Sequence, residues 1–101
     1  MADCATMEEA KAAYAAGADL VGSTMNGYTA ATAHCKDEPN YDLVREMAAA
    51  LPCPVIAEGR VHTPEQAKKM LEIGAWAVVV GGAITRPLEI AQRFFAALDP
   101  R

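Results

Sequence analysis

Residues 53–82, CPVIAEGRVHTPEQAKKMLEIGAWAVVVGG, decide the fold of this 101-residue chain. Two short apolar runs, residues 53–59 and 75–82, are rich in valine and isoleucine and end in glycine. Continuous apolar runs of this length are typical of strands that are buried on both faces of a parallel sheet. Parallel strands also need a crossover, which a helix between the two runs would supply. The stretch therefore predicts a strand, a helix and a second strand parallel to the first.

Helix-boundary signals support the helix between these two runs. Thr63 is a residue type that caps helix N-termini, and Pro64 follows it at the first helical position. Gln66 stands three residues after Thr63, where a capping box places a glutamine or glutamate. Gly74 is a typical helix stop. Because these signals agree, the sequence predicts a helix that begins after Thr63 and ends before Gly74.

Comparable signals occur over the rest of the chain, and each marks a strand or a helix boundary. They predict a helix between Thr6 and Gly17 with Glu9 in the capping-box position, a strand over residues 18–24, a helix over residues 41–51 capped by Asn40, and a helix from Pro87 to Leu98. The resulting alternation of helices and strands is that of an α/β fold with right-handed crossovers.

An internal repeat with an offset of 57 positions indicates which α/β fold this is. Its matched positions are Thr6 with Thr63, Glu8 with Glu65, Ala10 with Ala67, Lys11 with Lys68, Gly17 with Gly74, Ala18 with Ala75 and Val21 with Val78. The offset equals two strand–helix units of about 28 residues, and eight such units fill a (β/α)8 TIM barrel of about 250 residues. We therefore expect residues 1–101 to form one partial barrel domain, the C-terminal half with strands 5–8 and their helices. Its uncovered edges favour association with another chain.

Composition and charge exclude several classes of function. The net charge is −4 and no basic block is present, which argues against a nucleic-acid surface and against binding to an anionic membrane. No apolar run is long enough to span a bilayer, and no signal peptide is recognisable, so we expect a cytoplasmic protein. The three cysteines, Cys4, Cys35 and Cys53, are widely spaced and suit free thiols. His34 beside Cys35 cannot complete a tetrahedral site alone, and we expect no metal.

Polar or small residues stand at the expected C-terminal ends of the strands, where (β/α)8 enzymes carry their chemistry. These strand ends are Asp3, Ser23-Thr24, Glu58-Gly59-Arg60 and Gly81-Gly82. A carboxylate in such a position can serve as a general acid or base when its surroundings are partly dry. For Glu58, an ordinary salt bridge with Arg60 at the rim is an equally good interpretation.

The last strand ends also suggest an anion site. Gly59 allows the backbone to approach a ligand closely, and Gly81-Gly82 leaves backbone N–H groups bare ahead of the expected helix from Pro87. Sugar-phosphate barrels commonly hold phosphate between the loops that follow strands 7 and 8, and Arg86 would add a charge-assisted hydrogen bond. The alternative is a tight glycine turn beside a solvated arginine.

The remaining candidate residues have less specific signals. In the long loop over residues 24–40, Tyr28 or Thr29 would be able to touch a substrate, although packing of a solvent-facing loop explains them equally. His34 fits a surface side chain better than a catalytic base. Trp76, with the methionines and alanines of the helices, is expected in the core.

Three motifs in their order along the chain resemble one known family. They are MADC at the start, GxTMNGYT in the middle and PVIAEGRVHTPEQAKKMLEIGAWAVVVGGAITRP in the second half. The chain resembles the C-terminal half of bacterial N-acetylmannosamine-6-phosphate 2-epimerases, (β/α)8 barrels of sialic acid catabolism. The resemblance covers essentially all 101 residues, and the last motif is far more specific than any single glycine pair.

The resemblance implies a reaction and assigns residues to it. The reaction converts N-acetylmannosamine 6-phosphate to N-acetylglucosamine 6-phosphate by removal and return of the C2 proton, without a metal or cofactor. The residues that the resemblance implies are Glu58 as the catalytic acid or base, Asp3, Gly59 and Arg60 in substrate binding, and Gly81, Gly82 and Arg86 in phosphate binding. Many relatives carry serine at the position of Gly82.

The chain departs from the family in one respect that bears on activity. The family pairs its glutamate with a lysine from an earlier strand, whereas Lys11, Lys36, Lys68 and Lys69 all fall on expected helices or in the long loop. Loss of one member of a proton-transfer pair costs about two to four orders of magnitude in rate. We therefore expect the isolated chain to be inactive or nearly so.

Three interpretations stay open at this point. The chain is a part of an epimerase that needs a complementing N-terminal half, or a non-catalytic half-barrel that forms a homo-oligomer and binds a phosphorylated ligand. The third is a different phosphate-binding barrel enzyme. In the first interpretation the ligand is a phosphorylated amino sugar, and in none is nucleic acid or membrane a partner.

Overall fold

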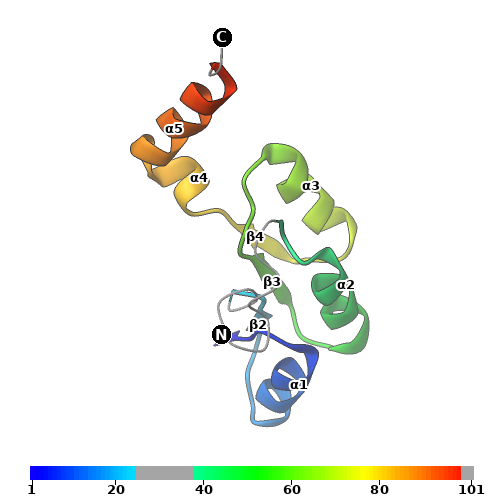
Figure 1. The fold of residues 1–101 in the computed structure, drawn as a ribbon. Coiled ribbons are helices and arrows are strands. Elements are labelled where there is room, and N and C mark those ends of the chain that lie inside the picture. Colours follow the sequence, from blue (N-terminus) through cyan, green and yellow to red (C-terminus); the bar gives the residue numbers. More distant parts are fainter. Residues whose placement is uncertain (25–37, 99–101) are drawn as a thin grey trace.

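The computed structural model describes residues 1–24 and 38–98, drawn in Figure 1. Strands and helices alternate along most of the chain, as the sequence predicts. The elements are β1 (Ala2–Asp3), α1 (Met7–Ala15), β2 (Val21–Gly22), α2 (Tyr41–Ala50), β3 (Val55–Glu58), α3 (Pro64–Glu72), β4 (Ala77–Val79), α4 (Gly82–Thr85) and α5 (Pro87–Leu98). The short helix α4 is the one described element that the sequence signals do not predict.

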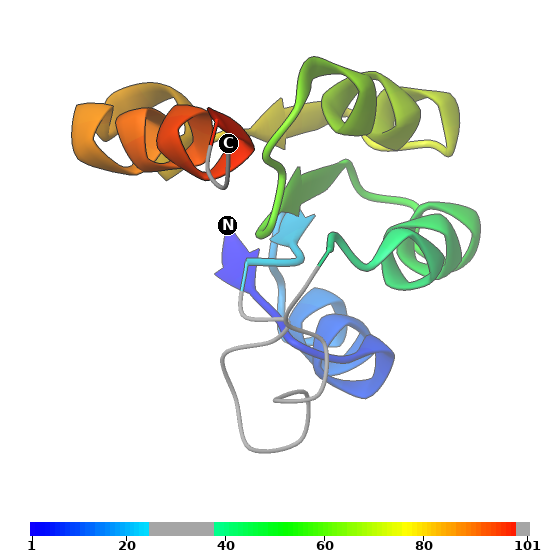
Figure 2. The same cartoon turned by 45° about the horizontal axis from the view of Figure 1, so that its top comes forward.

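The strands form one four-stranded sheet in the order β1-β2-β3-β4, and every neighbouring pair is parallel. Val21 of β2 is paired with both Ala2 of β1 and Val55 of β3, and Ile56 of β3 with Ala77 of β4. Figures 1 and 2 show α1, α2 and α3 together along one side of the sheet, whereas α4 and α5 extend beyond β4. This arrangement confirms the expected α/β fold with consecutive parallel strands.

The helix caps follow the sequence signals closely. The Thr63 side chain accepts a hydrogen bond from Gln66 N, and the Gln66 side chain accepts one from Thr63 N, which completes the predicted capping box. Asn40 caps α2 by accepting from Leu43 N. At α1, Thr6 accepts from Glu9 N, but the Glu9 carboxylate accepts from the amide of Ala5, one residue before the cap. Gln66 accepts in the same way from the amide of His62, one residue before its cap, and the capping box of α3 adds the bond from Thr63 N.

The core lies between the sheet and helices α1, α2 and α3. Its largest fully buried side chains come from both layers and are Met47, Met70, Val21, Val44 and Val55. The burial of Met47 and Met70 confirms the expectation for these two methionines, and Met7 packs against the same core while only partly buried. Full burial contributes about 1.5–3 kcal/mol per large apolar side chain, which makes this layer the main source of stability.

The expectation for the helix alanines is mostly wrong. Ala10 is buried, but other alanines are exposed because they lie on helix faces that no other described element covers. These exposed alanines are Ala12, Ala15, Ala49, Ala50, Ala96 and Ala97.

The burial expected for the last strand is wrong. Val79 of β4 is 39% exposed, and Trp76, just before this strand, is 75% exposed. Trp76 N donates to Val55 O at 2.8 Å, so its backbone is held in the sheet while its side chain lies uncovered. The reason is that β4 is an edge strand among the described residues, and nothing in them packs on its far side.

A second uncovered region lies on α4 and α5. No residue of α5 is buried, although the helix is amphipathic. Its large apolar side chains, with one from α4, form what we call the α4–α5 apolar surface: Ile84, Leu88, Phe94, Phe95 and Leu98, each at least 59% exposed. Contiguous exposed apolar surface of this kind marks interaction sites in monomeric proteins. Within residues 1–24 and 38–98, no helix has both the length and the apolar composition needed to cross a bilayer.

Candidate active site

The C-terminal ends of three adjacent strands meet around one threonine. Thr24 follows β2, and its hydroxyl lies within hydrogen-bonding reach of a carboxylate on each neighbouring strand, to one of which at a time it donates its single proton. It reaches Asp3 Oδ1 at the end of β1 at 3.1 Å and Oε2 of Glu58 at the end of β3. Thr24 therefore holds the side chains of Asp3 and Glu58 in place, and the sequence-predicted strand ends come together as expected.

Ser23 holds the main chain of the same glutamate. Its hydroxyl donates to Glu58 O and accepts from Glu58 N, both at 3.0 Å, and Ser23 is only 2% exposed. Next to these bonds, Ser23 N donates to Ile56 O at 3.1 Å, so the hydroxyl continues the hydrogen bonding between β2 and β3 past its regular end. Sequence reasoning noted Ser23 and Thr24 as a strand end but gave neither a role. The available signal was a pair of hydroxyl residues directly after a strand that neighbours the glutamate's strand.

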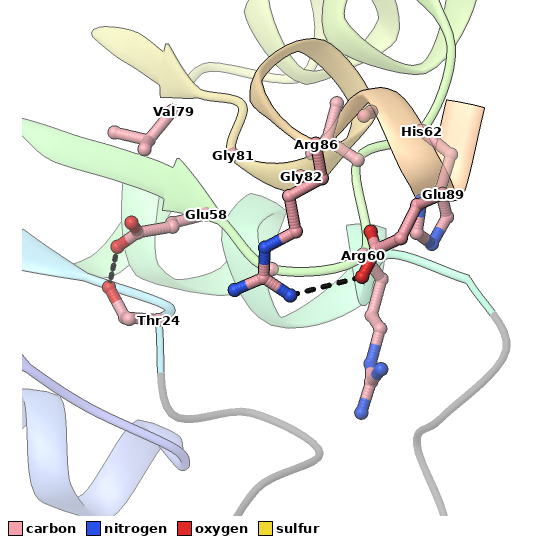
Figure 3. A pocket seen from close by; sticks show the side chains of 12 residues that line it. Thr24, Glu58, Arg60, His62, Val79, Gly81, Gly82, Arg86 and Glu89 are labelled. Atoms are coloured by element: carbon pink, nitrogen blue, oxygen red, sulfur yellow. Dashed lines mark hydrogen bonds and ion pairs between the residues drawn. The ribbon is translucent and has the colours of Figure 1, made fainter. Parts of the chain in front are cut away.

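The chain turns sharply after Glu58. Gly59 has φ +100° and Arg60 has φ +63°, and Arg60 is the one non-glycine residue with positive φ in the described segments. A non-glycine residue in this region costs about 1–3 kcal/mol and is found preferentially at functional sites. In Figure 3 the Arg60 guanidinium points away from Glu58, whose carboxylate meets Thr24. The structure thus does not support the rim salt bridge between Glu58 and Arg60.

A hollow of about 700 Å³ opens at this edge of the sheet. Its polar and charged lining comes from the ends of β2, β3 and β4 and from α4 and α5, and consists of Thr24, Glu58, Arg60, His62, Arg86 and Glu89. Gly59, Gly81 and Gly82 complete much of its wall with bare backbone. Asp3 does not line it and reaches it only through Thr24. The volume lies in the range of about 300–1,000 Å³ that is typical of small-molecule sites.

Arg86 lies at the end of the hollow formed by α4 and α5. Its Nη1 is 3.0 Å from Glu89 Oε1, and the two side chains are 70% and 46% exposed. Gly81 caps α4 without any side-chain hydrogen bond at the cap. The predicted phosphate residues Gly81, Gly82 and Arg86 are thus brought together, with an acidic partner on Arg86 that the sequence analysis missed (Figure 3). The signal for it was the three-residue spacing from Arg86, directly before α5, to Glu89 in the first turn of that helix.

Other sequence candidates lie away from the hollow or outside the described residues. Lys11 is in α1, and Lys68 and Lys69 are in α3, with the Lys69 amine 4.0 Å from the centre of the Tyr41 ring. The candidates Tyr28, Thr29, His34, Cys35 and Lys36 lie outside the described residues. Residues 1–24 and 38–98 contain no group of three or more His, Cys, Asp or Glu side chains arranged to hold a metal ion.

Cys4, next to Asp3, is unsuited to nucleophilic chemistry. Burial raises the pKa of its thiol, and the carboxylates of Glu9 and Asp3 raise it further. The thiolate is the reactive form, so a raised pKa keeps Cys4 protonated near neutral pH. Excluding Cys4 leaves the carboxylates of Asp3 and Glu58 and the imidazole of His62 as acid–base groups at this edge of the described residues.

Comparisons with known proteins agree with this geometry. A family model described as "Putative N-acetylmannosamine-6-phosphate epimerase" matches residues 1–100. Two relatives are named as 2-epimerases of the same sugar phosphate with the same qualifier. One, from Enterobacter sp. (strain 638), is 53% identical over 98% of this chain, and one from Lactiplantibacillus plantarum is 54% identical over 97%.

A solved structure extends the match to three dimensions. The N-acetylmannosamine-6-phosphate 2-epimerase from Clostridium perfringens superposes with a TM-score of 0.91 at 43% identity over 96% of this chain. The match covers 42% of that protein and 43% of the Enterobacter and Lactiplantibacillus proteins. The chain thus spans less than half the length of these relatives and has the fold of a partial barrel.

Proposed function

Because this chain belongs to the N-acetylmannosamine-6-phosphate epimerase family, we propose that it forms the part of such an enzyme that inverts C2 of N-acetylmannosamine 6-phosphate. The proposal rests on the hydrogen bonds that fix Glu58 at the wall of the hollow. Ser23 binds its main chain, and Thr24 binds its carboxylate. A proton-transfer group needs this kind of fixed geometry. Membership of the family favours this activity over that of a different phosphate-binding barrel enzyme.

The proposed chemistry is a proton removal and a proton return. One group takes the proton from C2, and a group on the other face of the sugar gives a proton back, which yields N-acetylglucosamine 6-phosphate with no net oxidation. Glu58 is the proposed acid or base for one of these steps. Asp3, linked to Glu58 through Thr24, is proposed to bind a substrate hydroxyl, and Gly59 and Arg60 to line the substrate on the β3 side.

The phosphate of the substrate is proposed to lie at the other end of the hollow. Arg86 supplies a guanidinium that can donate two parallel hydrogen bonds to phosphate oxygens, and the backbone of Gly81 and Gly82 lies beside it. The separation of this end from Glu58 within one hollow suits a sugar whose reacting carbon and phosphate are at different ends. The overall charge of −4 makes such a local site necessary, because the net field repels anions.

We propose that the isolated chain has little or no activity. No lysine of the described residues lines the hollow, and a second proton-transfer group must face Glu58 across the substrate. Four further strands would close an eight-stranded barrel. We propose that polypeptide equivalent to the rest of the relatives' length supplies these strands and covers the outer edge of β4 and the α4–α5 apolar surface.

Complementation tests both parts of this proposal. The chain is co-expressed with the N-terminal part of the Enterobacter relative that it does not match, and uptake of solvent deuterium at C2 of N-acetylmannosamine 6-phosphate is followed by NMR. We expect exchange only from the mixture, and a loss of about two to four orders of magnitude in rate for Glu58→Gln. The matched control Glu65→Gln, an exposed carboxylate in α3, should exchange like the parent.

Two outcomes would overturn the proposal. Exchange by the chain alone that Glu58→Gln does not reduce would remove Glu58 from the reaction. A stable homodimer that binds the sugar phosphate, with no exchange when the N-terminal part is added, would instead support the non-catalytic half-barrel. Mass by light scattering distinguishes the dimer from a complex with the N-terminal part.

We also propose that residues 1–101 act as one unit and that the protein works in the cytoplasm. The free thiols of Cys4 and Cys53 support the second point, because free cysteines suit a reducing compartment. Limited proteolysis tests whether residues 1–101 act as one unit, because the strands and helices of a single unit should become sensitive to the protease together.

A further inference from the structure

One corner of the hollow is filled by a carboxylate from the chain itself. Glu89, in the first turn of α5, extends back toward α4 and meets Arg86 at 3.0 Å (Figure 3). Its other oxygen, Oε2, lies 2.7 Å from the point that a Cβ on Gly82 would occupy. The Glu89 carboxylate therefore occupies Nη1 of Arg86 and the space above Gly82.

A phosphate at this corner would need the same two features. A phosphate held by two parallel hydrogen bonds from Arg86 would compete for the Nη1 that now donates to Glu89, and the space above Gly82 is where the ligand would approach bare backbone. A second anion beside Glu89 would also be repelled at this short range. Glu89 and a bound phosphate consequently exclude one another, provided that the proposed phosphate site is correct.

We propose that Glu89 is a tethered competitor that occupies the phosphate corner in the unliganded chain and must leave when phosphate enters. The exchange is possible because the pair between Arg86 and Glu89 is exposed, and exposed pairs are weak. Only the molecules in which Glu89 has left the corner can bind an anion there. The apparent affinity for the anion is therefore lower than the affinity of the vacant corner. Every anion meets the same reduction, whatever its charge.

Gly82 is the residue that makes room for the competitor. A methyl group at this position would fall 2.7 Å from Glu89 Oε2, closer than a real contact allows, while the nearest Arg86 atom would be 3.3 Å away. The atom that must move, Glu89 Oε2, is at the far end of a flexible side chain. The carboxylate should therefore rotate away at a small cost in free energy. Gly82→Ala is therefore a way to displace the competitor without changing any charge, although its methyl group also narrows the space that the phosphate would use.

The first test compares two small anions of the same shape at one pH. Methyl phosphate and methyl sulfate are titrated at pH 7.5 and constant ionic strength, and the amide NMR signals of Gly81 and Gly82 report binding. We expect Glu89→Gln to tighten both ligands by the same factor, about three- to fivefold, as the loss of a weak exposed pair allows. The control Glu65→Gln removes an acid from the first turn of α3, away from the hollow, and should change neither affinity beyond a small effect of net charge that is larger for methyl phosphate, the more highly charged ligand at this pH. Unchanged or weaker binding in Glu89→Gln overturns the proposal.

The second test asks whether both variants act through the same group. Gly82→Ala should tighten binding less than Glu89→Gln, because its methyl group also narrows the space for the ligand, and the double variant should gain nothing over Glu89→Gln alone. A further gain in the double variant would show that Gly82→Ala does not act through Glu89 and would overturn the role given to Gly82. Arg86→Ala separates this inference from the proposed function. If it leaves binding unchanged, the phosphate site itself is wrong; if it weakens binding while Glu89→Gln has no effect, only the competitor is wrong.

Discussion

The two ends of the sheet differ in how their polar groups are held. At β1, β2 and β3, Asp3 and Glu58 are fixed by the hydroxyls of Ser23 and Thr24 above a core of fully buried side chains. Beyond β4, Arg86 pairs only with an exposed carboxylate, and no residue of α5 is buried. The Glu58 end is thus held rigidly by described residues, although the proposed second proton-transfer group is not among them, whereas the proposed phosphate end depends on a weak exposed pair.

The largest expected contrast between the two ends is in how much a buried or an exposed side chain contributes to the free energy of unfolding. Met47→Ala should lower the free energy of unfolding by about 2–5 kcal/mol, because Met47 is fully buried and its loss leaves a cavity. Denaturant unfolding of the purified chain measures this. Phe94→Ala on α5 is the matched comparison, and we expect a change within about 0.5 kcal/mol because that side chain is 70% exposed. Equal losses in the two variants would contradict the division into a packed and an uncovered region.

The next largest effect tests the hydroxyl that holds Glu58. Ser23→Ala leaves the N–H and C=O groups that the hydroxyl served in a buried place without this partner, which costs about 1–3 kcal/mol. Chemical denaturation gives the loss. Ser23→Cys keeps a similar volume and a weak donor and should recover part of it. In the complemented enzyme, Ser23→Ala should lower kcat more than it raises KM, and unchanged stability and kcat would argue that Ser23 is not a positioning residue.

A smaller effect of opposite sign is expected at the turn after β3. Arg60→Gly should raise the free energy of unfolding by about 1 kcal/mol, because glycine relieves the positive φ at a modest entropic cost in the unfolded chain. Arg45→Gly, the same change in the right-handed backbone of α2, should lower it by about 1 kcal/mol. Thermal unfolding compares the two variants with the parent chain. If both arginine variants lose stability equally, the turn holds no strain.

The smallest effect on folding should come from the uncovered end itself. Phe95→Ser and Leu88→Ser should each leave the unfolding midpoint within about 0.5 kcal/mol of the parent, since both side chains are 70% exposed. They should nonetheless weaken the complex with the N-terminal part in a pull-down of the co-expressed pair. If both variants bind the N-terminal part as well as the parent does, the added strands do not cover the α4–α5 apolar surface.

Local chemistry explains which features were predictable from the sequence. The caps at Thr63 and Asn40 and the glycine stops depend on windows of a few residues, and the structure confirms them. Parallel strand order followed from the alternation of elements, and that order alone placed Asp3 and Glu58 at one edge. Short-range signals therefore accounted for the fold and for where the site lies.

The features that were missed depend on contacts distant in sequence or on what covers a surface. Ser23 and Glu58 are 35 positions apart, and nothing near either residue announces their hydrogen bonds. Trp76 looks like a core residue by type, but its burial depends on whether another element covers the edge of β4. The pairing of Arg86 with Glu89 also depends on the room that Gly82 leaves, which only coordinates reveal.

The uncovered Trp76 gives the protein a built-in optical reporter. It is the single tryptophan of the sequence and lies before β4, at the opposite end of that strand from the hollow. Its fluorescence should therefore shift to the blue when another polypeptide covers that edge, and it should not change when a small anion enters the hollow. One emission spectrum can thus separate assembly from ligand binding, without a label and without altering a residue of the site.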